Sequence, residues 1–379
     1  MLTGILYLDW AALALSLFNT ILLVWLGLTV LLNAERRSWG IWLTGGGLLV
    51  AGAFFFSHSA IFGHSQTDLE PGLNIWWHVG WVPAILSPFA WYIEMLWYGG
   101  FWDDSTAPIR RRQLPGLVFV VLLALGSLGM VFFANPFPSF TRVANLDLES
   151  TPTIAGIPLL ILVYLVYIIL CTGLSLDALR FPGPSSRLMG ELARRRARSW
   201  FIAASLVLLL VSVLVAWVML WIVINAAEDR EFSSLVSAIG WFDVSISALI
   251  GLAVVLLGQA IVAYEVFTGK SLPRRGLARY WRRAVILAGG YSLVVGGALT
   301  LQLRPIYILL VTTLVMTVFY ALLSWRSYAE RERFIEHLRP FVTSQRLYET
   351  LLTGPSPASS LVPAELEVDA PFRALCRDI

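Results

Sequence analysis

Charged residues are scarce in this chain of 379 residues. Asp, Glu, Lys and Arg together make up 13% of the sequence, whereas hydrophobic residues make up 58%. A soluble globular domain carries about 25% charged and about 45–50% apolar residues. The composition therefore excludes a soluble enzyme, a disordered chain and a nucleic-acid-binding protein. It predicts a protein with several membrane-spanning segments, whose partner is the lipid bilayer.

Cysteine, lysine and common catalytic motifs are nearly absent as well. Two cysteines, Cys171 and Cys376, are too few for a disulfide framework. The single lysine, Lys270, lies in a predicted loop, whereas a retinal protein needs a lysine in mid-span for its Schiff base. No P-loop, GxSxG or CxxC motif occurs in the sequence. We therefore expect no enzymatic activity within these residues and no resident cofactor.

Nine hydrophobic segments are long enough to cross a bilayer, which takes about 20 mostly apolar residues. They are roughly residues 8–33, 39–62, 75–101, 114–134, 155–179, 200–225, 235–266, 284–303 and 305–326. The start of the chain has neither a basic region nor a small-residue cleavage site, so we expect no removal as a signal peptide. The predicted fold class is an all-α bundle of about nine spans. It is arranged as seven spans plus a hairpin formed by the last two.

The basic residues are distributed unevenly among the predicted loops. If the N-terminus is outside, all but three of the 27 Lys and Arg residues fall on the cytoplasmic side, the exceptions being Arg142, Arg230 and Arg304. The positive-inside rule favours this arrangement. A missed or invented span would reverse every later loop and abolish the asymmetry. We therefore predict a multi-pass protein of the cytoplasmic (inner) membrane, with its N-terminus outside, its C-terminus inside and an odd number of spans.

The composition becomes polar at Trp325, near the end of the last predicted span. We divide the chain into a transmembrane bundle (1–326), a cytoplasmic signalling helix (327–353) and a linker-like segment (354–379) that begins Gly-Pro-Ser-Pro. A folded domain usually needs at least about 50 residues, and no external loop reaches that length. Any stimulus must therefore meet the bundle itself.

Ionisable groups inside spans are costly and by default mark function. Those nearest the predicted outer side are Asp9, His58, His64, His78 and Asp243. His58 ends the second span and His78 begins the third, so the connecting hairpin could bring them together. We select His58, His78 and Asp243 as candidate ligand-binding residues.

Several interpretations of these histidines stay open. Imidazoles ligate transition metals and titrate near neutral pH, so His58 and His78 could form a haem, metal or proton-sensing site. His58 and His64 lie about 240° apart around a helix, however, and the sequence contains no HxxxH or HExxH pattern. The simpler interpretation is that they are interfacial histidines hydrogen-bonded to neighbours, with no metal bound.

Other polar residues lie deeper in the predicted spans. Glu94 is about 24 Å along a helix from His78, so it cannot join the outer group. We expect Glu94 to snorkel and neutralise a cytoplasmic arginine, and Asn19 to form an interhelical hydrogen bond. Pro83 and Pro88 predict a kink in the third span, which is either a packing irregularity or a hinge that lines a pocket.

The segment after the last predicted span carries a heptad-like pattern. Its apolar members are Phe334, Leu338, Phe341, Tyr348 and Leu352. This spacing is typical of a coiled-coil seam and predicts a parallel helix pair in a homodimer. Gln345 at a core position, Pro340 within the run and the short length leave a second interpretation open, a single amphipathic helix on the membrane surface.

The order of these parts resembles the membrane sensor region of bacterial multi-span histidine kinases, which begin with a seven-span-type module. Residues 258–276, GQAIVAYEVFTGKSLPRRG, are similar to a junction segment in such proteins. Residues 371–379, PFRALCRDI, are similar to the start of a GAF-like cytoplasmic domain. The resemblance implies a sensor that acts on a downstream kinase domain or a separate cytoplasmic signalling partner.

The sequence contains no ATP-binding domain and no phospho-acceptor helix of the kind that such kinases carry. His337 lies in Glu-His-Leu-Arg-Pro, which differs in order from the phospho-acceptor pattern His-Glu-Leu-Arg-x-Pro. We therefore expect kinase activity only if the chain continues beyond Ile379.

These observations predict a non-enzymatic sensor and signal transducer, which the resemblance identifies as the membrane part of a two-component system. The first alternative is an integral subunit of a membrane redox complex, with haem or quinone near His58 and His78. The second is a transporter, which the scarcity of charge within the spans disfavours.

Overall fold

The computed structural model describes residues 5–33, 39–63, 71–103, 106–133, 153–154, 157–183, 191–226, 232–264 and 275–301, together with 308, 312–314 and 316. All of them belong to one compact unit, residues 1–316. Its elements are α1 (Leu6–Asn33), α2 (Trp39–Gly63), α3 (Pro71–Gly99), α4 (Pro108–Phe133), β1 (Thr153–Ile154), β2 (Ile157–Pro158), α6 (Leu159–Arg180), α7 (Glu191–Ala226), α8 (Phe232–Tyr264) and α9 (Arg275–Thr300). The two short strands pair antiparallel just before α6.

Within these ranges, eight helices are long and apolar enough to cross a membrane. The predicted fold class, an all-α bundle of membrane-spanning helices, is therefore confirmed. The ninth predicted span, residues 305–326, falls mostly outside the described residues, although 308, 312–314 and 316 are helical. The predicted signalling helix 327–353 and the segment 354–379 lie wholly outside them.

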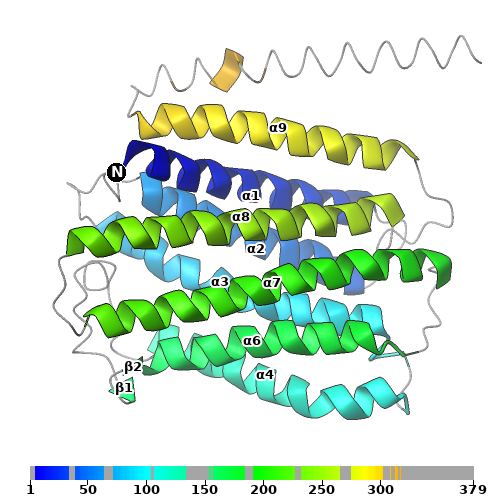
Figure 1. Ribbon diagram of the computed structural model, residues 1–379. Helices are drawn as coiled ribbons and strands as arrows, with labels where there is room; N and C mark the ends of the chain where they lie inside the picture. The colour runs from blue at the N-terminus through cyan, green and yellow to red at the C-terminus, as the bar shows by residue number, and fades with distance from the viewer. Residues whose placement is uncertain are drawn as a thin grey trace, which may run out of the picture. The chain divides into compact units, whose positions relative to one another are not determined.

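Successive helices run side by side in alternating directions (Figure 1). Helix α1 packs against α2, α8 and α9, whereas α3 packs against α2, α4 and α6. Helix α7 contacts both α6 and α8, and so joins the two groups. Because α1 lies against both α2 and α8, residues that are far apart in the sequence can meet along it.

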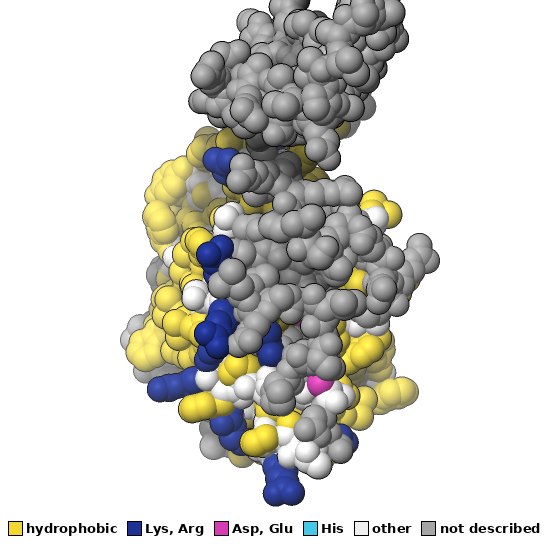
Figure 2. Space-filling view, turned by 90° about the vertical axis from the view of Figure 1, so that its right-hand side faces the viewer, with side chains coloured by type: hydrophobic (Ala, Val, Ile, Leu, Met, Phe, Trp, Pro, Cys, Tyr) yellow, Lys and Arg dark blue, Asp and Glu magenta, His cyan; other side chains and the backbone are white. Residues whose placement is uncertain are grey.

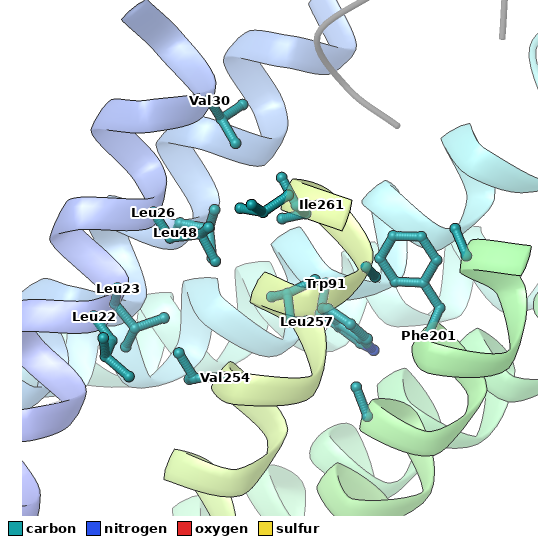
Figure 3. Close-up of a cluster of buried hydrophobic side chains, with 14 of the residues drawn as sticks. Leu22, Leu23, Leu26, Val30, Leu48, Trp91, Phe201, Val254, Leu257 and Ile261 are labelled. Carbon is teal, nitrogen blue, oxygen red and sulfur yellow. The ribbon is translucent and has the colours of Figure 1, made fainter. Parts of the chain in front are cut away.

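Apolar side chains fill the space between the helices in two clusters. The larger one draws mainly on α1, α2, α3, α7, α8 and α9, and the smaller one mainly on α3, α4 and α6. Figure 3 shows the larger cluster: leucines of α1 lie near Leu48 of α2 and Val254 of α8, and Phe201 of α7 lies near Trp91 of α3 on the other side of the view. Large apolar side chains also cover the outside of the bundle, with exposed fractions such as 61% for Leu125. Lipid tails are as apolar as leucine, so this exposure suits a bilayer.

Helix α3 continues through Pro83 and Pro88. A proline lacks the N–H that would bond the carbonyl four residues earlier, so Pro88 leaves the Ala84 carbonyl without its usual helical donor. The Tyr164 hydroxyl of α6 lies 3.4 Å from that carbonyl oxygen, and the Tyr167 hydroxyl donates to the Ile85 carbonyl at 2.6 Å. Two tyrosines of a neighbouring helix thus support the proline-containing stretch of α3.

One end of the bundle carries all the arginine side chains that the structure describes. They are Arg110, Arg111, Arg112, Arg180, Arg194, Arg195, Arg196, Arg198, Arg282 and Arg283. This arginine end is where α1, α3, α6 and α8 finish and where α2, α4, α7 and α9 begin. Figure 2 looks onto it and shows the arginine side chains gathered there.

Candidate functional site

A polar cluster joins three helices near the end of the bundle opposite the arginines. Asp243 of α8 lies with its Oδ1 atom 3.1 Å from Nε2 of His58, which is on α2. The other ring nitrogen of His58, Nδ1, lies 3.1 Å from the Ser16 hydroxyl of α1. We call these three residues the outer cluster. Its members are separated by up to 227 positions in the sequence, and only the packing of α2 and α8 on α1 brings them together.

Further hydrogen bonds fix the Ser16 hydroxyl group of the outer cluster. Ser16 donates to the Phe55 carbonyl at 2.9 Å, and the Ser59 hydroxyl donates to the Ser16 hydroxyl oxygen at 2.8 Å. Ser16 is fully buried, so α1 holds this contact inside the bundle. Because Ser16 already donates to Phe55, its oxygen is left to accept from its neighbours.

Aromatic rings enclose the imidazole of His58. The Phe62 ring centroid lies 4.8 Å away and the Phe54 ring is stacked at 6.1 Å. The side chains of His58 and Asp243 are 19% and 24% exposed. Atom Oδ2 of Asp243 is buried and has no hydrogen-bond partner among the described residues. The pair is therefore shielded from solvent, and one carboxylate oxygen stays available to a further donor.

A second polar contact lies next to the outer cluster along α1 and α8. The Asn19 side-chain amide donates to the Ser247 carbonyl at 2.9 Å, and both residues are buried. The expected interhelical hydrogen bond of Asn19 is therefore confirmed. Ser247 lies one helical turn from Asp243, so the polar contacts that α8 makes with α2 and with α1 follow one face of α8.

The structure brings together two of the three candidate ligand-binding residues. His58 and Asp243 form a direct pair, whereas Nδ1 of His78 lies 2.7 Å from the Asn74 carbonyl of its own helix, α3. His64 lies outside the described residues. Both ring nitrogens of His58 face protein oxygen atoms, so haem or metal ligation by His58 would require the imidazole to leave at least one partner. No group of three or more His, Cys, Asp or Glu side chains in the described part of the chain is arranged to hold a metal ion.

Glu94 does not snorkel, and that expectation is wrong. Its side chain is 4% exposed and lies in hydrogen-bonding contact with Thr44 of α2. Atom Oε1 is buried without a partner among the described residues. Glu94 faces α2 inside the bundle, so its carboxyl group cannot reach the water layer where the arginines lie.

Sequence reasoning missed a second polar network, at the arginine end. Gln113 of α4, which is 1% exposed, accepts from the Tyr92 hydroxyl at 2.9 Å and donates to the Asp177 carboxylate of α6. Arg112 pairs with the same carboxylate at 2.8 Å. Little in the sequence indicated that Gln113 is buried, because a glutamine beside three arginines at a helix start is typical of a solvated loop.

Arginines of α7 also bind the ends of two other helices. Arg194 donates to the Tyr98 carbonyl at the end of α3, and Arg198 donates to the Leu179 and Arg180 carbonyls at the end of α6. The last carbonyls of a helix have no intrahelical donor and carry the negative end of the helix dipole. The guanidinium groups of α7 thus donate hydrogen bonds to these carbonyls and place positive charge at the negative ends of the two helix dipoles.

The fold and these contacts define a multi-pass α-helical membrane protein with a partly buried His–Asp pair in its bundle. Comparison with protein-family models, with curated proteins and with solved structures finds no match for the chain.

Proposed function

We propose that the protein is a membrane-embedded sensor, in which a change in the helix bundle is transmitted to the cytoplasmic segment 327–353. The outer cluster supports this proposal. In it, His58 of α2 bonds to Asp243 of α8 and to Ser16 of α1, so a polar contact connects three helices. The core of the bundle around it is mostly apolar. A contact of this kind can be made or broken as a unit, and a stimulus that favours one state shifts the balance between two arrangements.

The arrangement of charge supports an orientation for this sensor. The described arginine side chains all lie at one end of the bundle, and Asp9, His58 and Asp243 lie toward the other, near the start of α1, near the end of α2 and in the first half of α8. By the positive-inside rule the arginine end faces the cytoplasm, and the outer cluster faces the outside. A signal received at the outer cluster then travels along α8 toward the cytoplasmic side.

The first experiment tests transmission without knowledge of the stimulus. The variant His58→Phe removes both hydrogen bonds of the imidazole but keeps an aromatic ring of similar size. We expect faster amide hydrogen exchange in residues 237–250 of α8 and an altered exchange rate in 327–353, measured by mass spectrometry on detergent-solubilised full-length chain. His78→Phe is the matched control, because it leaves the His58–Asp243 pair in place.

The proposal fails if the exchange of residues 327–353 is the same in wild type and His58→Phe while α8 responds. In that case the outer cluster stabilises the bundle without communicating with the cytoplasmic segment. Asp243→Asn serves as a second variant, and it should reproduce the exchange pattern of His58→Phe because it weakens the same contact.

A further inference from the structure

A cavity opens beside the start of α7 at the arginine end. Its volume is about 490 Å³, and the described side chains that line it are Arg195, Arg198, Ser199 and Ile202. Spacings of three and four residues place all four on one face of the helix. Along that face the side chains change from two guanidinium groups to a hydroxyl and then to an aliphatic group, over about 10 Å of helix axis.

Neighbouring carbonyls hold one of these guanidinium groups in place. Arg198 donates from Nε to the Leu179 carbonyl at 2.7 Å and from Nη2 to the Arg180 carbonyl at 2.6 Å. These bonds use the Nε–Nη2 edge of the guanidinium plane, and Nη1 lies on its other edge. A planar group fixed in this way is well suited to bind a phosphate, because little side-chain entropy is lost on binding.

The same face of α7 continues into the membrane as an apolar stripe. Its members beyond Ile202 are exposed by 50% or more and are Leu206, Leu210, Val213 and Trp217. From Ile202 to Val213 the helix rises about 16 Å, which matches the thickness of about 15 Å for the hydrocarbon of one leaflet. The cavity and the stripe together provide a cationic site for a headgroup, followed by an apolar track for an acyl chain.

We propose that this face of α7 binds an anionic glycerophospholipid, with the lipid phosphate in the cavity between Arg195, Arg198 and Ser199 and an acyl chain along the stripe from Ile202. Basic pockets between spans on the cytoplasmic side suit anionic headgroups. A choline headgroup would place a third cation beside the two guanidinium groups, so phosphatidylcholine is disfavoured. The lipid would also contact the residues that cap the end of α6, and would stabilise the junction of α6 and α7.

The test compares two adjacent arginines. Arg195→Gln removes a guanidinium group from the cavity, whereas Arg196→Gln removes the same charge from an exposed residue about 100° away around the helix that does not line it. Native mass spectrometry of the detergent-solubilised full chain would count bound phosphatidylglycerol, phosphatidylcholine and inorganic phosphate. We expect wild type and Arg196→Gln to retain phosphatidylglycerol in preference to phosphatidylcholine. We expect Arg195→Gln to bind phosphatidylglycerol about fivefold more weakly, as loss of about 1 kcal/mol per basic side chain implies.

Two results would overturn the proposal. Equal loss of phosphatidylglycerol in the two variants would show a diffuse attraction to the whole arginine end. Binding of inorganic phosphate as tight as that of phosphatidylglycerol would show an anion site that does not use the apolar stripe. Ser199→Leu is a second variant in case Arg195→Gln is unstable. It keeps both charges, and it should weaken phosphatidylglycerol binding by filling the cavity.

Discussion

At the scale of single residues, we expect burial to decide how much each polar contact of the network at the arginine end stabilises the fold. The ion pair of Arg112 and Asp177 is formed by side chains that are 41% and 36% exposed, whereas Gln113 is 1% exposed. Exposed ion pairs contribute about 0–1 kcal/mol, because water screens them and competes for both partners. A buried group that loses its hydrogen-bond partner costs about 1–3 kcal/mol.

We therefore expect Gln113→Leu to lower the free energy of unfolding by about 1–3 kcal/mol, because it leaves the Tyr92 hydroxyl without an acceptor. Arg112→Gln should lower it by less than about 1 kcal/mol. Reversible unfolding in mixed micelles, followed by circular dichroism, measures both values. A larger loss in Arg112→Gln than in Gln113→Leu would contradict this ranking.

At the scale of helices, small residues set how closely neighbouring helices approach. A methyl group added at Gly258 of α8 would overlap the ring of Trp281, which is 1% exposed on α9 and packs 5.6 Å from the Trp25 ring of α1. Because the Trp281 ring is enclosed on all sides, it cannot move away without separating the helices. The contact among α1, α8 and α9 therefore depends on a glycine at this position.

Gly258→Ala should destabilise the protein by about 1–3 kcal/mol, which is the usual cost of overpacking a core. The matched control is Gly289→Ala on α9, where an added methyl group meets no atom within 4 Å. That control should be neutral or slightly stabilising, because alanine is the better helix former. The same unfolding measurement compares the two variants. An equal loss in the free energy of unfolding would show that the stability depends on the backbone flexibility of glycine and not on the close approach of the helices.

At the scale of the whole molecule, the charge distribution predicts how the bundle lies in the membrane. Tyr7, near the start of α1, is 58% exposed and lies at the end opposite the arginines, whereas Arg111, near the start of α4, lies at the arginine end. In a background without Cys171 and Cys376, we expect Tyr7→Cys to react with a membrane-impermeant maleimide in intact cells. Arg111→Cys should react only after the cells are permeabilised. The opposite labelling pattern would reverse the proposed orientation.

The sequence by itself determined the class of protein and most of its helix positions. Residues 39–62 were predicted as a span and α2 is Trp39–Gly63, and the first predicted span, 8–33, corresponds to α1 at Leu6–Asn33. These features depend on local composition, because a bilayer requires a continuous apolar segment of a set length. The choice of His58 and Asp243 as candidates followed from the same reasoning, since an ionisable group stands out in an apolar span.

Only the tertiary structure decided which polar residues meet. His58 and Asp243 are 185 positions apart, and their pairing depends on the packing of α2 and α8 against α1. The sequence could not show this, because a membrane helix is apolar on the faces toward lipid and toward protein alike, so periodicity does not reveal which face is buried. The burial of Gln113 and of Glu94 was hidden for the same reason. The fold placed these polar groups inside the bundle, where Gln113 bonds to Tyr92 and Asp177 and Glu94 contacts Thr44 in place of water.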